Sequence, residues 1–159
     1  MEAKIANEVL EKISFLNGLN DKELALVAGL CTKHSYATGE TCQSEGQPTN
    51  RINLIIKGKV GIVNRFSGTY SSGEITTDIF RDGEVFGWSA FLHGAPWSTL
   101  KALEPTDVLQ MNVNDLVNLC ETNHDIGYYL MKNLASLIST RFRRNRMSLL
   151  NAIVAIKGE

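Results

Sequence analysis

One segment of the chain combines the residue types of a small-molecule pocket, because it is uncharged, rich in aromatic rings and carries glycines and hydroxyl groups. Residues 85–100 include no Asp, Glu, Lys or Arg, and they hold both tryptophans of the protein. Indole rings stack on planar groups, whereas hydroxyls and the backbone N–H groups of a tight turn can hold an anion. The segment therefore predicts a binding pocket, and its candidate residues are Phe86, Gly87, Trp88, Ser89, Ala90, Trp97, Ser98 and Thr99.

The elements that position this segment are predicted to be short strands connected by tight turns. Nine of the 13 glycines lie between Gly39 and Gly94, and glycine supplies the positive φ angles that hairpin turns require. Residues 51–57 and 60–63 are apolar runs separated by Lys-Gly-Lys, which is typical of two strands and their turn. We therefore expect a β core in the middle of the chain.

Helices are predicted on both sides of this core. Apolar residues recur at helical spacing from Ile5 to Leu16, and Asn20 with Glu23 three positions later is typical of a helix N-terminus with a capping box. From Asp115 onward the chain has no proline and almost no glycine, which indicates a mostly helical end. The predicted fold class is therefore mainly β with flanking helices.

The C-terminal helix carries an apolar seam with alternating spacings of four and three residues. This heptad pattern favours packing against a partner helix, and a polar Asn in such a seam can fix its register. Packing of this face on the chain's own β core is the alternative, and four nearby arginines between Arg141 and Arg146 are typical of a solvated helix face. The expected dimer interface consists of Met131, Ala135, Ile138, Phe142, Asn145 and Leu149.

Several separate motifs resemble the cyclic-nucleotide-binding domains of the catabolite activator family. They are the Gly-Glu of residues 39–40, the Glu-Gly of 45–46, the strand and turn of 54–60, the Gly-Glu-Val-Phe-Gly of 83–87, and residues 102–109. The resemblance implies a jelly-roll (double-stranded β-helix) barrel and a long helix that mediates dimerisation. It also implies one domain over 1–159, with N-terminal helices in 1–32, the barrel in 33–112 and C-terminal helices in 113–157.

The candidate pocket departs from the family pattern at its two charged positions. The family has Glu, which accepts from the ribose hydroxyl, where this chain has Trp88, and Arg, which pairs with the phosphate, where it has Trp97 or Pro96. Loss of one partner of a buried charge pair costs about 2–5 kcal/mol, so ordinary cyclic AMP sensing is disfavoured. Three interpretations stay open: tryptophans that fill a vacated pocket, an apolar pocket for another ligand, or weak and altered cyclic-nucleotide binding.

The residue types that catalysis or a metal site would need are not arranged for either. His34, His93 and His124 share no metal-ligand spacing, and no Ser-His-Asp or Cys-His arrangement is visible. We therefore expect no enzyme activity, no metal and no obligatory cofactor. The three cysteines suggest no disulfide framework, and the net charge of −1, the lack of a secretory signal and the lack of a membrane span favour a cytoplasmic protein.

The sequence thus predicts a stand-alone regulatory or sensor module of the cyclic-nucleotide-binding type, which forms a homodimer and lacks the usual Glu and Arg for cyclic AMP. An unidentified small molecule is one of the open interpretations of its pocket. A pure interaction or scaffold module is the alternative. The family's regulators carry a helix-turn-helix domain after the long helix, and the chain has no room for one. We therefore expect no DNA binding by this chain on its own, and no membrane contact.

Overall fold

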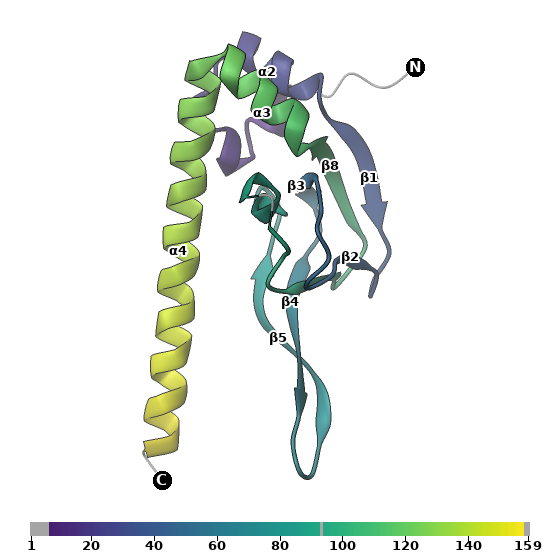
Figure 1. Cartoon of the computed structure of the whole chain (residues 1–159), viewed down its shortest axis with the longest axis vertical. Helices are drawn as coiled ribbons and strands as arrows, with labels where there is room; N and C mark the ends of the chain where they lie inside the picture. Colours follow the sequence, from purple (N-terminus) through teal and green to yellow (C-terminus); the bar gives the residue numbers. More distant parts are fainter. Residues whose placement is uncertain (1–6, 93, 158–159) are drawn as a thin grey trace.

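The computed structural model describes residues 7–92 and 94–157, in which two four-stranded antiparallel sheets form a jelly-roll barrel beside a long helix (Figure 1). One sheet has the strand order β1-β8-β3-β6 and the other β2-β7-β4-β5. The strands are β1 (Thr32–Tyr36), β2 (Thr41–Gln43), β3 (Arg51–Lys57), β4 (Val60–Ser67), β5 (Ser72–Phe80), β6 (Val85–Phe86), β7 (Thr99–Ala102) and β8 (Thr106–Asn112). The predicted fold class is therefore confirmed.

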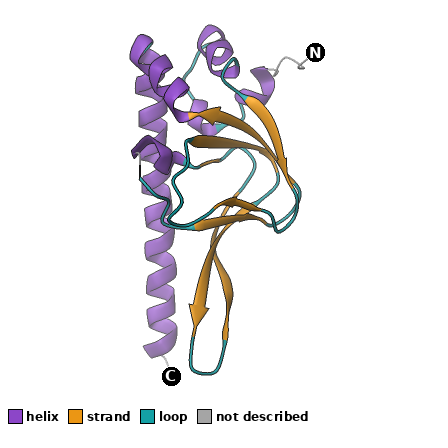
Figure 2. Cartoon of the chain, turned by 45° about the vertical axis from the view of Figure 1, so that its right-hand side comes forward, coloured by secondary structure: helices purple, strands orange, loops and turns teal. Residues whose placement is uncertain are grey.

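Strand β3 is buried on both of its faces, which explains its nearly continuous apolar sequence. Ile52 and Leu54 pack in the core between this sheet and the helices, whereas Ile55 lies in the separate core inside the barrel. A strand that is covered on both faces loses the alternation of polar and apolar residues. The helices α1 (Asn7–Leu10), α2 (Asp21–Ala28) and α3 (Val113–Thr122) gather at one end of the barrel (Figure 2).

The N-terminal helical region is predicted in part. Asn20 Oδ1 accepts from the N–H groups of Lys22 and Glu23, and the Glu23 carboxylate accepts from the Asn20 N–H at 2.8 Å, so the capping box is present. The continuous helix expected up to Leu16 is wrong, because α1 ends at Leu10 and a separate 3₁₀ turn, η1 (Ser14–Leu16), follows. Both segments bury their apolar side chains, and this tertiary packing overrides the local helical pattern. Ile5 lies outside the described residues.

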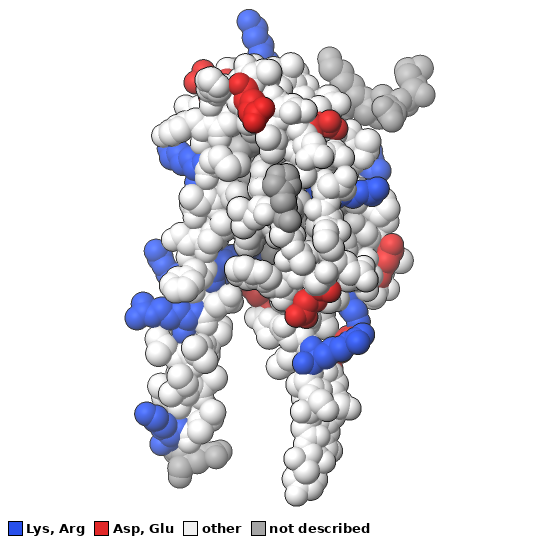
Figure 3. Space-filling model, in the orientation of Figure 1, with Lys and Arg blue, Asp and Glu red and all other residues white. Residues whose placement is uncertain are grey.

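The long helix α4 (His124–Lys157) packs on the rest of the chain through a different face from the predicted seam. Ile126, Leu130, Leu134 and Arg141 are its buried residues, and the predicted seam from Met131 to Leu149 lies on the adjacent, exposed face. Every described residue of α4 after Arg141 is exposed. In Figure 3, the lower part of α4 and the β4–β5 hairpin project from the body as two separate arms. None of the helices in the described ranges is long and apolar enough to cross a membrane.

Candidate functional site

A cavity of about 420 Å³ lies where the candidate segment, strands β4 and β5, and helix α4 meet. The segment contains β6, the 3₁₀ helix η2 (Trp88–Leu92) and, from Gly94, the stretch that leads into β7. Most of the lining is apolar, and six of its residues are polar or charged. The lining side chains that matter below are Ile62, Phe80 and Leu100 from the barrel strands, Trp88 from η2, Ile138 and Phe142 from α4, and the polar Gln43, Asp78, Ser89, Ser98, Arg141 and Asn145.

Gly87 fixes the start of η2 against the neighbouring strand. Its φ is +84°, and a Cβ atom built there would lie 2.5 Å from the carbonyl oxygen of Arg51 in β3. Both the left-handed conformation and the close approach to backbone exclude a side chain. The glycine after Phe86 therefore turns the chain out of the barrel, and this turn presents Trp88 and Ser89 to the cavity.

Five of the eight candidate residues line the cavity, namely Gly87, Trp88, Ser89, Trp97 and Ser98. The other three do not. Phe86 is fully buried in the barrel core, where its ring centroid lies 6.0 Å from that of Phe80, and Ala90 is buried in the core under the helices. The Thr99 hydroxyl accepts a hydrogen bond from the N–H of Glu45 at 3.1 Å. These three residues support the segment, whereas the first five form its inner surface.

The tryptophans leave the cavity open. Trp97 is 90% exposed at its mouth, and Trp88 is half-buried, packing partly against the core under the helices. The hydroxyl of Ser89 is buried and has no hydrogen-bond partner among the described residues. The cavity volume given above is what remains after both indoles are in place.

Arg141 of α4 is the functional residue that the sequence analysis missed, because it treated the arginines as a solvated cluster. Its residue surface is only 6% exposed, and its guanidinium carbon lies 3.4 Å from the centroid of the Phe80 ring. Nη1 forms a close ion pair with Asp78, and Nη2 lies 3.5 Å from Glu84. Burial lowers the pKa of the guanidinium, while the two carboxylates oppose that shift. The group therefore stays charged, and its Nε is buried without a hydrogen-bond partner among the described residues.

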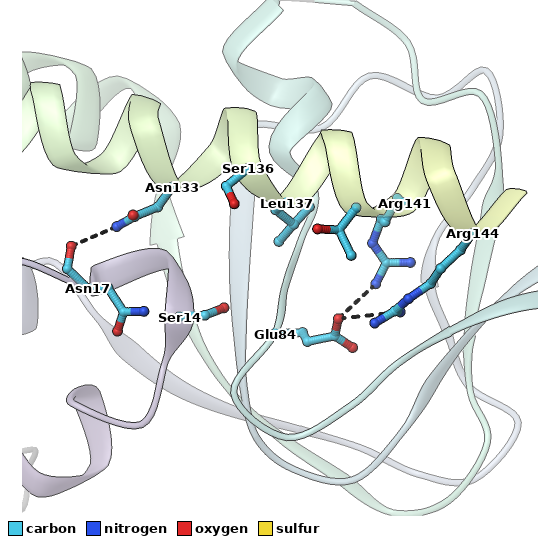
Figure 4. A pocket seen from close by; sticks show the side chains of 9 residues that line it. Ser14, Asn17, Glu84, Asn133, Ser136, Leu137, Arg141 and Arg144 are labelled. Carbon is cyan, nitrogen blue, oxygen red and sulfur yellow. Dashed lines mark hydrogen bonds and ion pairs between the residues drawn. The ribbon is translucent and has the colours of Figure 1, made fainter. Parts of the chain in front are cut away.

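A second, polar pocket of about 220 Å³ lies on the other side of Arg141 (Figure 4). There Glu84 reaches Arg141 and, at 3.9 Å, the half-exposed Arg144. At its far end, Asn133 Nδ2 donates to the carbonyl oxygens of Phe15 and Asn17 at 3.0 and 2.8 Å. These contacts fix α4 to the η1 segment and to the turn before β6.

Two further groups that could hold an anion, the ammonium of Lys101 and the N–H of Ala90, are engaged elsewhere. Lys101 Nζ pairs with Glu74 of β5 at 2.7 Å and does not line the cavity. The N–H of Ala90 donates to the carbonyl oxygen of Gly87 at 3.1 Å, so it is not free to bind a ligand. His93 lies outside the described residues. Among the residues that the structure describes, no three His, Cys, Asp or Glu side chains gather as a metal site would need.

The predicted dimer seam and the cavity share residues. Ile138, Phe142 and Asn145 line the cavity on its helical side, and Phe142 is nevertheless 72% exposed. Met131, Ala135 and Leu149 are exposed on the same helix and lie outside the cavity. The cavity wall on α4 is therefore open to solvent at its edge.

Comparison with known proteins agrees with the fold. A structure of a cyclic nucleotide-binding domain from Methylobacillus flagellatus superposes with a TM-score of 0.77 at 20% identity, covering 91% of this chain and 80% of that one. The catabolite activator protein of Thermus thermophilus superposes with a TM-score of 0.68 at 24% identity, covering 86% and 61% respectively. At these identities the likeness concerns the fold.

The sequence itself also matches known proteins. It is 24% identical over 119 residues to a cAMP-dependent protein kinase regulatory subunit of Dictyostelium discoideum, covering 74% of this chain and 36% of that protein. The chain thus spans about a third of that relative's length. Residues 33–123 match the family described as the cyclic nucleotide-binding domain, and this match extends over more than half of the chain. The chain belongs to the cyclic nucleotide-binding domain family.

Proposed function

We propose that this chain is a cytoplasmic regulatory domain that senses a small molecule other than ordinary cyclic AMP, and that it has no catalytic activity of its own. The observation that carries the proposal is an open cavity whose single guanidinium among the described lining residues, Arg141, is already paired with two carboxylates. A free positive charge strengthens the binding of a cyclic phosphate, and a guanidinium that is already paired attracts it less. Cys31, Cys42 and Cys120 are free thiols, which fits a reducing compartment.

The proposed signal is a shift of α4 relative to the barrel. Four of the lining residues, Ile138, Arg141, Phe142 and Asn145, belong to α4, and the remainder belong to the barrel and its loops. A ligand in the cavity therefore contacts both α4 and the barrel, and it favours one arrangement of the helix relative to the barrel. Such a ligand changes the helix population only through its different affinity for the two arrangements.

Intrinsic tryptophan fluorescence tests the choice of ligand, because Trp88 and Trp97 are the only tryptophans and both line the cavity. We expect no saturable change with cyclic AMP or cyclic GMP in the micromolar range. A saturable micromolar response to either nucleotide would show an altered cyclic-nucleotide binder and overturn the proposal.

We also propose that α4 pairs with α4 of a second copy through the exposed seam. The support is its exposed apolar surface, which includes Phe142 at 72% and Leu149 at 62%, and apolar seams of this spacing pair with a second helix. In sedimentation, Leu149→Glu is expected to dissociate the dimer, since it places a charge in the seam. Asn151→Glu adds the same charge on the opposite face of α4 and should leave the dimer intact. A wild-type protein that sediments as a monomer at all concentrations contradicts this pairing.

A scaffold without a ligand remains the competing function, favoured by the same exposed seam. It predicts that stability does not depend on any small molecule, whereas a sensor is stabilised by its ligand through mass action.

A further inference from the structure

The ionic and apolar groups of the cavity indicate which class of molecule it accepts. Aromatic rings of Phe80, Trp88 and Phe142 surround it, and its buried charges, Arg141 and Asp78, neutralise each other. We propose that the cavity binds an uncharged, mainly apolar molecule and discriminates against anions. This inference rests on the proposed function, in which the cavity is the ligand site of a regulatory domain.

Arg141 is poorly placed to attract an anion. Its guanidinium stacks on Phe80 and is held between Asp78 and Glu84, whose side chains are 14% and 23% exposed. An anionic group that reached the guanidinium from the cavity would have to displace the Asp78 carboxylate or lie beside it. Like charges in a partly buried site repel, and a displaced carboxylate would be left without a partner.

Apart from Arg141 and Asp78, the polar side chains of the described lining are all uncharged, namely Gln43, Ser89, Ser98 and Asn145. The ammonium group of Lys101 is held by Glu74 outside the cavity, and the N–H of Ala90 is used within η2. The Ser89 hydroxyl is buried and without a partner, and a hydroxyl can bond a neutral carbonyl or hydroxyl of a ligand as well as a charged one. The polar lining therefore fits a molecule with one or two neutral polar groups.

The size and shape of the cavity agree with this class. A volume of about 420 Å³ falls within the range of about 300–1,000 Å³ that is usual for sites of drug-sized ligands. The indole of Trp88 and the rings of Phe80 and Phe142 offer stacking faces, so a planar ring system fits better than a flexible chain.

Two fluorescent probes with the same ring system separate apolar from anionic recognition. N-phenyl-1-naphthylamine is uncharged, and 1-anilinonaphthalene-8-sulfonate adds one sulfonate to the same skeleton. Both accept excitation energy from nearby tryptophan, and both tryptophans of this chain line the cavity. We expect saturable energy transfer to the neutral probe and an affinity for the sulfonate that is weaker by about 10-fold or more.

One pair of variants tests whether the neutral probe binds in the cavity. A second pair tests whether Asp78 causes the weaker binding of the sulfonate. Ser98→Phe fills the cavity and should lower the affinity for the neutral probe by about 10-fold. Tyr70→Ser lies at a hairpin position that is 99% exposed and should leave this affinity unchanged. Asp78→Asn releases part of the guanidinium and should raise the affinity for the sulfonate by about 10-fold. Asp115→Asn removes the same charge at an exposed position of α3 and should have no such effect.

The outcomes distinguish this inference from the function on which it rests. Preferential binding of the neutral probe, lost in Ser98→Phe and retained in Tyr70→Ser, supports both. Equal or tighter binding of the sulfonate at the same site overturns the inference and leaves the cavity as a ligand site. If the wild-type protein is folded by circular dichroism and shows no saturable energy transfer to either probe, both the inference and the proposed function are overturned.

Discussion

Arg141 is predicted to tether the lower half of α4 to the barrel, and its replacement tests this directly. Its side chain is 8% exposed, its partner Asp78 is 14% exposed, and it also contacts Glu84 and the Phe80 ring. Arg141→Ala leaves Asp78 without its ion-pair partner and leaves Glu84 with Arg144 alone. Removal of one member of a buried ion pair costs about 3–5 kcal/mol.

The lower end of this range applies here, because Glu84 is partly exposed and Arg144 lies only 3.9 Å from it and can replace the lost charge. We therefore expect a loss of about 3 kcal/mol in the free energy of unfolding. For a chain of this length, each kcal/mol lowers Tm by about 2–4 °C, so Tm should fall by about 6–12 °C. Urea and thermal unfolding followed by circular dichroism measure both quantities.

A double-mutant cycle separates the ion pair from the packing of the long side chain. Arg141→Met keeps most of the volume, and combining it with Asp78→Asn removes both charges, so the double variant should recover about 2 kcal/mol relative to the sum of the single variants. Arg144→Ala is the matched control, since an exposed pair contributes less than about 1 kcal/mol. A loss below 1 kcal/mol in Arg141→Ala, or additive single variants, would refute the reasoning.

Three other positions give independent tests of the fold around the site. Gly87→Ala should lower the free energy of unfolding by more than about 2 kcal/mol, and Gly39→Ala by only about 1 kcal/mol. Both glycines have a positive φ, but only a Cβ atom at Gly87 would clash with the backbone, at the carbonyl oxygen of Arg51. Urea unfolding measures both losses. Asn133→Ala removes two hydrogen bonds between α4 and the η1 segment and should raise hydrogen exchange in both. Burial raises the pKa of the Cys31 thiol from its ordinary 9.0 to about 12. The folded state therefore keeps a proton that the unfolded chain releases. That stabilisation is complete below pH 9 and is lost as the pH rises towards 12, so unfolding free energies between pH 8 and 11 should fall less steeply in Cys31→Ala.

Local signals in the sequence predict the frame of this domain well. The capping box at Asn20, the turn after Phe86 and the apolar run of β3 each depend on neighbouring residues, and each appears in the structure. The expected helix through Ile13 fails, since burial of Ile13 and Leu16 in the core decides the chain path there and periodicity does not report it. Segments whose conformation depends on distant packing are the ones that a local pattern misses.

The charged centre of the site could not be predicted from the candidate segment alone. Arg141 is 63 positions from Asp78 in the sequence, and an arginine among other arginines is usually solvated. One signal was nevertheless present. Arg141 continues the spacing of Leu130, Leu134 and Leu137, so it lies on the face of α4 that packs on the chain. An isolated charge on an apolar helix face indicates a buried partner, and this criterion would have identified it.

The tether also determines which movement of α4 a ligand can favour. A ligand that pulled Arg141 away from its carboxylates would lose the same interaction of about 3 kcal/mol, which is more than 100-fold in affinity. A ligand that lies against the Phe80 ring and the helix without moving the guanidinium loses nothing. Tight binding therefore selects the arrangement in which α4 remains on the barrel. Because all described residues after Arg141 are exposed, the measurable consequence is slower hydrogen exchange in residues 142–149 when the cavity is occupied. Faster exchange there would mean that the ligand displaces the arginine, and that the domain signals by releasing its helix.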